Sequence, residues 1–200
     1  VPTQCARYRE IDCWVRLGMI HRKAGNYPAA VLTAEKGLEV AEKHGWVGRI
    51  GELNSGLGFH LRAQGEFEAA IRYHKASLDL FRQQCGMRRE EAVQQSYLGN
   101  LYTDLGLFDN ARESYQKAED TARAIGLRRE LSWILANRGV LYCRFGDYEK
   151  ALALQQQALT IVTENSHLDS QVVRFTDLSA TLLAMGKPKE AEEALLSALD

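Results

Sequence analysis

The sequence has few of the residues that interrupt or cross-link a chain. Its 200 residues include three prolines and four cysteines. No two cysteines are spaced as Cys-x-x-Cys and no pair of histidines accompanies them, so the zinc and dithiol redox patterns are missing. We expect all four to be free thiols of a protein in a reducing compartment, the cytoplasm; they are Cys5, Cys13, Cys85 and Cys143.

Long apolar runs and a secretory leader are also missing. No stretch approaches the roughly 18–20 apolar residues that span a bilayer. The N-terminal residues, Val1 and Pro2 onward, do not show a charged segment followed by an apolar one, as a signal peptide would. We therefore expect no membrane partner. Because the sequence starts without methionine, we also expect it to be a piece of a longer chain.

Charge of one sign does not dominate, since the formal net charge is −1. This balance gives no global indication of a nucleic-acid partner. The distribution is uneven: residues 1–145 hold 21 Lys and Arg against 17 Asp and Glu, whereas residues 146–200 hold 4 against 9. A basic body with an acidic end is compatible with an acidic partner or with head-to-tail contact between copies. Ordinary charging of solvated helix faces is the simpler explanation, and we favour it.

Catalytic and metal-binding motifs are missing as well. The segment "GLGF" at 56–59 is not followed by Gly-Lys-Ser/Thr, so it predicts no phosphate site. The five histidines never occur as His-x-x-x-His, and "EAEEA" at 190–194 is typical of a solvated helix face. The basic "MRRE" and "LRRE" segments lack the interleaved aromatics expected for nucleic acid. We predict a protein that is not an enzyme and has no cofactor or metal.

What the sequence does have is a period of 40 residues. A seven-residue segment recurs with glycines at 25, 65, 106, 146 and 186, so the spacings are 40, 41, 40 and 40. The five copies are "AGNYPAA" (24–30), "QGEFEAA" (64–70), "LGLFDNA" (105–111), "FGDYEKA" (145–151) and "MGKPKEA" (185–191). Internal repeats with such a period indicate a stack of similar supersecondary units.

Two further positions repeat in the same register. Seven residues before each joint glycine stands a small residue: Gly18, Gly58, Gly99, Gly139 and Ser179. Five residues after the joint glycine every copy has alanine: Ala30, Ala70, Ala111, Ala151 and Ala191. A glycine inside a helix costs about 0.5–1 kcal/mol relative to alanine. Its recurrence predicts that two helix backbones approach closely at this position.

Each unit is predicted to contain two helices. In the third unit, residues 90–106 and 107–126 both carry apolar residues three and four positions apart, which is the helical spacing. The glycine between them ends the first helix, because glycine adopts the left-handed conformation at little cost. Pro28 and Pro188 fall in the first turn of a second helix, where proline is tolerated. About ten helices fill the chain, and no strand pattern is present.

This pattern resembles the tetratricopeptide repeat (TPR) over residues 7–200. The third unit carries nearly the whole motif: Leu98, Gly99, Tyr102, Ala111, Tyr115 and Ala118. The units exceed the common length of about 34 residues and lack the proline that often ends the second helix. In this they are similar to the longer repeats of bacterial regulators, kinesin light chains and the Leu-Gly-Asn repeat scaffold.

The resemblance implies an all-α, right-handed α-α superhelix of five TPR-like helix pairs. We expect one solenoid over residues 1–200, with units at approximately 7–45, 46–86, 87–126, 127–166 and 167–200. Stacked pairs share a core that one pair alone could not form.

The resemblance also implies a binding groove on the first helices of the pairs. Asparagines there would hold a peptide backbone, cations would hold carboxylates and apolar residues would contact side chains; the alternative is that these residues are merely solvated or pack between repeats. The predicted groove residues are Met19, Arg22, Lys23, Phe59, Arg62, Asn100, Trp133, Asn137 and Arg144.

Two functions remain open. The first is a non-enzymatic scaffold that binds a protein or peptide in the groove, with an acidic partner among the candidates. The alternative is a self-association or spacer module of a larger signalling or transcriptional regulator, which would include a homo-oligomer. The fifth unit has an apolar wall that a further helix, another copy or a ligand would cover, formed by Thr176, Ala180, Leu183 and Ala184.

Overall fold

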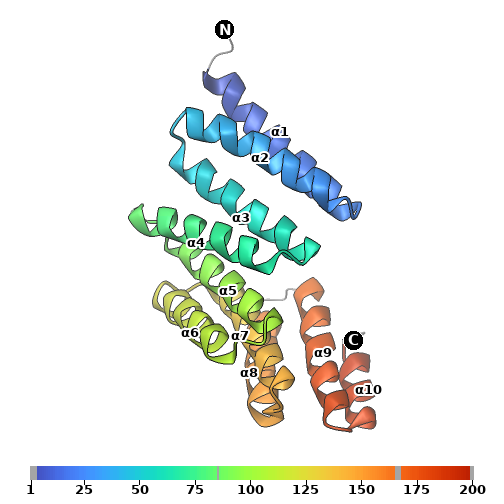
Figure 1. Ribbon diagram of the computed structural model, residues 1–200. Coiled ribbons are helices and arrows are strands. Elements are labelled where there is room, and N and C mark those ends of the chain that lie inside the picture. The colour runs from blue at the N-terminus through green and yellow to red at the C-terminus, as the bar shows by residue number, and fades with distance from the viewer. Residues whose placement is uncertain (1–3, 85, 165–167, 199–200) are drawn as a thin grey trace. The chain divides into compact units, whose positions relative to one another are not determined.

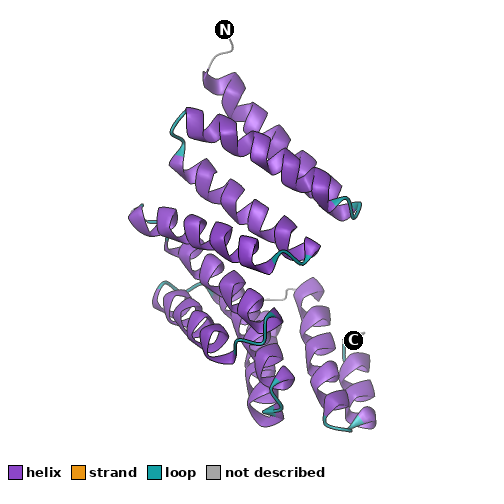
Figure 2. Cartoon of the chain, viewed as in Figure 1, coloured by secondary structure: helices purple, strands orange, loops and turns teal. Residues whose placement is uncertain are grey.

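The computed structural model describes residues 4–84, 86–164 and 168–198. Within these ranges the chain consists of helices and short turns, without a strand (Figure 2). The ten helices are α1 (Gln4–Lys23), α2 (Tyr27–Lys43), α3 (Val47–Gln64), α4 (Phe67–Gln83), α5 (Arg88–Asp104), α6 (Phe108–Ala124), α7 (Arg128–Arg144), α8 (Tyr148–Glu164), α9 (Leu168–Ala184) and α10 (Pro188–Leu196). The all-α prediction is confirmed. We call α1, α3, α5, α7 and α9 the A helices and the others the B helices.

The chain divides into two compact units, Val1–Leu101 and Tyr102–Asp200, and we describe each separately. In the first unit α2 packs on α1, α3 on α2 and α4 on α3 (Figure 1). In the second unit the same succession continues from α6 to α10, so each helix contacts the next one along the chain. The single solenoid expected over residues 1–200 stays a prediction.

The joint glycines end the A helices as the sequence predicts. Gly65 has φ +86° and its N–H donates to the carbonyl oxygen of Arg62 at 3.0 Å, which closes α3. A side chain at this φ would be strained, so glycine is the residue that fits. Pro28 lies in the first turn of α2 and Pro188 begins α10, as expected.

The repeated small residue and alanine lie at the contact between the two helices of a pair. A Cβ added at Gly139 of α7 would lie 3.1 Å from the carbonyl oxygen of Ala151 on α8. Ser179 takes this position in the last pair, and its Oγ donates to the carbonyl oxygen of Ala191 at 3.0 Å. The five repeated alanines are all buried: Ala30, Ala70, Ala111, Ala151 and Ala191. The predicted close approach is therefore present.

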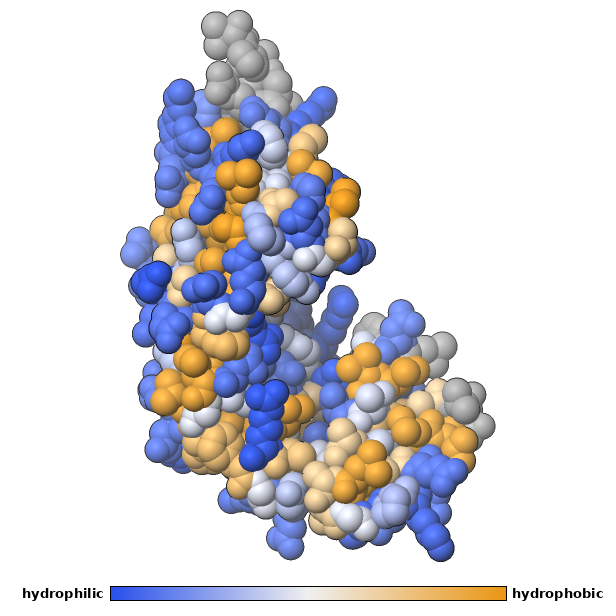
Figure 3. Space-filling view, turned by 45° about the vertical axis from the view of Figure 1, so that its right-hand side comes forward, coloured by the Kyte–Doolittle hydropathy of each residue, from blue (hydrophilic) through white to orange (hydrophobic). Residues whose placement is uncertain are grey.

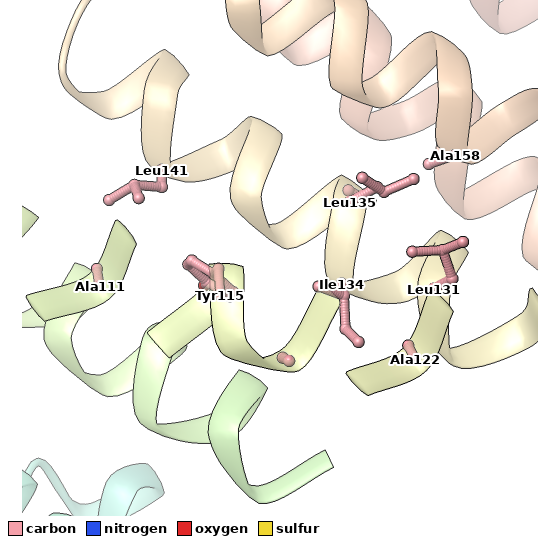
Figure 4. Packing of buried hydrophobic residues seen from close by; sticks show 10 residues of the cluster. Ala111, Tyr115, Ala122, Leu131, Ile134, Leu135, Leu141 and Ala158 are labelled. Atoms are coloured by element: carbon pink, nitrogen blue, oxygen red, sulfur yellow. The ribbon is translucent and has the colours of Figure 1, made fainter. Parts of the chain in front are cut away.

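Apolar side chains from successive helices form the cores. In the second unit Tyr115 of α6 and Ile134 of α7 belong to one buried cluster that extends to Ala158 of α8 (Figure 4). In the first unit a smaller cluster joins Ile11, Ala41 and Leu53. Fully burying a side chain such as leucine or isoleucine stabilises a fold by about 1.5–3 kcal/mol. Buried apolar side chains shared by successive helices therefore hold the stack together within each unit.

Candidate functional site

The predicted groove residues of the first unit differ in how far they reach solvent. Met19 on α1 is 52% exposed, and Arg22 and Lys23 are exposed in the last turn of the same helix. Arg62 is half-buried in the last turn of α3. Cations at a helix C-terminus interact favourably with the helix dipole. The C-terminal ends of two successive A helices therefore carry positive charge.

Two buried histidines lie close enough to these cations to respond to them. Burial, and secondarily the charge of Arg22, lowers the pKa of His60. Burial also lowers the pKa of His74 to about 4; a hydrogen bond to Gln94 opposes this shift and the charge of Arg62 adds to it. Both imidazoles are consequently neutral at pH 7, and both experience a positive potential from the A helices.

Phe59 was predicted as a groove residue, but much of its side chain packs inside the first unit. Its ring centroid lies 4.3 Å from that of Tyr97 and 5.6 Å from that of His74, both in edge arrangements. Sequence reasoning missed the polar chain beside it: His74 Nδ1 bonds Gln94 Oε1 at 2.8 Å, and Gln94 Nε2 donates to Ser55 Oγ at 2.9 Å. The sequence feature that could have indicated this polar chain is His74 itself, because it stands where the next repeat has Tyr115.

Asn100 lies half-buried on α5, one residue after the small Gly99. In the second unit Trp133 on α7 is half-buried and packs against the apolar cluster. Half-burial leaves part of each side chain accessible to a ligand, so packing and binding do not exclude one another at these positions. Their groove role stays a prediction.

Asn137 and Arg144 mark the rest of the predicted groove on α7. The Nδ2 atom of Asn137 is buried and has no hydrogen-bond partner among the described residues. Arg144 is exposed at the end of the helix, and its Nη1 lies 3.3 Å from Oδ1 of Asp104 on α5. This ion pair bridges two A helices one repeat apart.

The last helix pair exposes apolar side chains. Val173 on α9 is 48% exposed and Leu183 is 56% exposed, and the predicted wall residues Thr176, Ala180 and Ala184 are exposed beside them. Leu195 and Leu196 on α10 are also exposed. Figure 3 shows this as hydrophobic surface gathered over α9 and α10. The described surface of this pair is thus less polar than that of a fully solvated helix pair.

The described residues hold no group of three or more His, Cys, Asp or Glu side chains placed to bind a metal ion. Cys13 and Cys143 are free thiols, while Cys5 and Cys85 lie outside the described side chains. In the same part of the chain no helix is both long and apolar enough to cross a membrane.

Family models for the tetratricopeptide repeat match nearly the whole chain. One matches residues 49–124, 90–164 and 130–200, and a second matches residues 11–44. The chain belongs to the tetratricopeptide repeat family. The resemblance found in the repeated glycines and alanines is thereby confirmed, and so is the fold of TPR-like helix pairs.

Solved TPR-type structures share the fold at low sequence identity. The Rap conjugation gene regulator of plasmid pLS20, in complex with the Phr* peptide, matches with a TM-score of 0.80 and 17% identity over 92% of this chain and 51% of that one. Aspartyl phosphate phosphatase F from Bacillus subtilis matches with a TM-score of 0.81 and 16% identity over 96% and 50%. A kinesin light chain protein of Podosopora anserina with nearly identical TPR-like repeats matches with a TM-score of 0.73 and 17% identity over 94% of this chain and 92% of that one.

These similarities establish the fold alone. The TPR chain spans about half the length of the Rap regulator and of the phosphatase, and nearly all of the kinesin light chain protein. No curated protein matches its sequence.

Proposed function

We propose that this TPR protein is a non-enzymatic scaffold that binds an acidic peptide or protein segment on its A helices. The observation that carries the proposal is the position of Arg22, Lys23 and Arg62 at the C-terminal ends of α1 and α3. An extended segment lying across these two ends would meet positive charge from two successive repeats. Opposite charge on the ligand would speed its association and favour this partner over neutral ones.

Support also comes from the fold. The Rap regulator, which shares the fold of this chain, was solved in complex with a peptide. Repeat arrays of this kind present extended surfaces that suit elongated ligands. Within the first unit, Asn100 would bond the backbone of the segment, and Met19 and the accessible part of Phe59 would contact its side chains.

The test is a binding measurement with fluorescent peptides of about 12 residues, one rich in Asp and Glu and one with the same composition but Asn and Gln in place of the acids. We expect the acidic peptide to bind more tightly, with an affinity that falls as salt rises, because exposed charges are screened. In the double variant Arg22→Glu/Arg62→Glu this preference should disappear.

The matched control is Arg72→Glu, which makes the same charge change at an exposed position of the B helix α4. It should leave binding unchanged if the A helices form the site. An equal loss in the control, or no loss in the double variant, would show that the A helices do not bind the peptide.

A self-association or spacer role is the second candidate, and the exposed apolar residues of α9 and α10 favour it. An apolar patch of this kind, rimmed by polar residues, often marks a protein contact. If copies associate through α9 and α10, Leu183→Glu/Leu195→Glu should lower the mass measured by light scattering at high concentration. A mass of one chain for the unmodified protein at every concentration would exclude self-association.

A further inference from the structure

At one register the contact between α8 and α9 is polar where the equivalent contact between α6 and α7 is apolar. Tyr115 of α6 and Ile134 of α7 belong to the same buried cluster (Figure 4). Forty residues later, at the same register, stand Gln155 on α8 and Arg174 on α9. Gln155 is 1% exposed and Arg174 is 8% exposed. An apolar pair of one repeat contact is therefore replaced by two buried polar side chains in the next.

These two side chains are incompletely bonded. Neither Nε2 nor Oε1 of Gln155 has a hydrogen-bond partner among the described residues. Arg174 Nε lies 3.3 Å from Oδ2 of Asp177 but makes no hydrogen bond. Burial raises the pKa of the Asp177 carboxyl, which is the response of a partly desolvated acid. A buried polar group that loses water without gaining a partner disfavours the closed state.

The equivalent position in the first unit is polar too, but there the two side chains bond each other. His74 on α4 and Gln94 on α5 occupy this register, and the 2.8 Å bond between them continues to Ser55. A polar pair is thus compatible with tight stacking when each group is bonded. The α8–α9 contact has the polar residues without that network.

Apolar residues at neighbouring register positions favour the packing of α9 on α8. Leu159 of α8 is buried and Leu178 of α9 is half-buried at the register where the preceding repeats have Glu119 and Arg138. Val162 is buried at the register of Ala122. Apolar attraction at these positions opposes the cost of the polar pair beside them. The contact between α8 and α9 therefore combines apolar residues that stabilise it with a buried polar pair that destabilises it.

We infer that α9 and α10 open from α8 as a separate cooperative unit while α6, α7 and α8 stay folded, and that Gln155 and Arg174 set this behaviour. The last pair also has little apolar burial of its own, since much of its apolar surface faces solvent. Opening would uncover Leu159 and Val162 on α8. A ligand that bound this uncovered face would shift the population toward the open form.

Hydrogen exchange of the intact protein, followed by mass spectrometry, tests the inference. Under native conditions we expect amides of α9 and α10 to exchange about tenfold or more faster than those of α7 and α8, because a unit that opens locally exchanges ahead of the rest. The double variant Gln155→Tyr/Arg174→Ile copies the Tyr115–Ile134 pair. It should slow exchange in α9 and α10 by about tenfold and leave α7 unchanged.

A second variant weakens the same contact from the other side. Leu159→Ala should speed exchange in α9 and α10 and leave the amides of α6 protected. Tyr115→Gln/Ile134→Arg places the polar pair at the contact between α6 and α7, and that contact should then open faster. If α7 to α10 exchange with one common rate in the unmodified protein, the inference is wrong, whatever the variants do. Unchanged exchange in a folded Gln155→Tyr/Arg174→Ile protein would overturn the role of the pair.

Discussion

His74 on α4 and Gln94 on α5 form a buried hydrogen bond of 2.8 Å between consecutive helices of the first unit. The imidazole Nδ1 donates and the amide oxygen accepts, and the other edge of the imidazole lies directly against Gly58 of α3. A Cβ added at Gly58 would lie 2.5 Å from ring atoms of His74. The small residue of the repeat is thus required here by the size of its neighbour.

This contact predicts opposite effects for two glycines of the same helix. Gly58→Ala should destabilise the protein by about 1–3 kcal/mol, since it overpacks a filled core. Gly56→Ala is the control: nothing lies within 4 Å of its added Cβ, and alanine should stabilise α3 by about 0.5–1 kcal/mol. Urea unfolding of the two variants measures both. Similar effects in the two variants would show that His74 can move aside.

His74 also predicts how stability depends on pH. Its pKa is about 4 in the folded protein, below the ordinary 6.5, so the unfolded chain binds the proton more tightly. The stability gained from the neutral form is therefore complete above pH 6.5 and is lost as the pH falls toward 4, a loss of about 3 kcal/mol.

Urea unfolding at pH 7 and at pH 4.5 measures this loss. The His74→Gln variant keeps a group that can bond Gln94 but cannot titrate, so its stability should fall less over the same range. The part of the loss that remains in the variant includes the contribution of His60, whose pKa is also lowered. Equal losses in both proteins would contradict the role of His74.

Two residues predicted for the groove should respond differently to truncation. Phe59→Ala removes a ring that packs on Tyr97 and His74. A fully buried phenylalanine that is cut to alanine lowers the free energy of unfolding by about 3–5 kcal/mol, and Phe59, which is half-buried, should lower it by less. Met19→Ala, at the same repeat position on α1 but 52% exposed, should change stability by less than about 0.5 kcal/mol. Thermal unfolding compares them, and a loss at Met19 as large as that at Phe59 would contradict the packing seen here.

The ion pair between Arg138 and Glu119 offers a double-mutant test. Their atoms lie 2.6 Å apart, with side chains 17% and 10% exposed. Glu119→Leu should cost about 1–3 kcal/mol, because the partly buried charge of Arg138 loses its carboxylate partner; Arg138→Leu should cost less, because Glu119 keeps its ion pair with Arg123. The double leucine variant copies Leu159 and Leu178 of the next contact and should recover most of that loss. Additive losses in the double variant would indicate that the two charges act independently.

The repeated residues were sufficient to predict the helices and their turns. The five joint glycines, Pro28 and Pro188 lie where the pattern places them, because backbone conformation and helix capping depend on residues that are neighbours in sequence. Ala151 against Gly139 could be predicted for the same reason, since the two positions lie within one helix pair. These repeated residues alone are sufficient to indicate the family.

The candidate site was only partly accessible to such reasoning. Met19, Arg22 and Lys23 reach solvent, whereas much of Phe59 lies against His74 and Tyr97, and the groove role of all four stays a prediction. Which side of an A helix remains open depends on the side chains of the next repeat. Contacts between residues 20 or more positions apart depend on how the repeats stack, so the sequence spacing alone does not predict them.

The sequence by itself determined that this protein is an all-α array of TPR helix pairs, since period, turn glycines and buried alanines are local properties that repeat. Only the tertiary structure decided how the polar exceptions behave. Gln94 bonds the imidazole of His74, while the amide of Gln155 at the register of His74 finds no hydrogen-bond partner among the described residues. The physical reason is that hydrogen bonding depends on distance and angle between side chains of different repeats, which residue type and spacing do not specify.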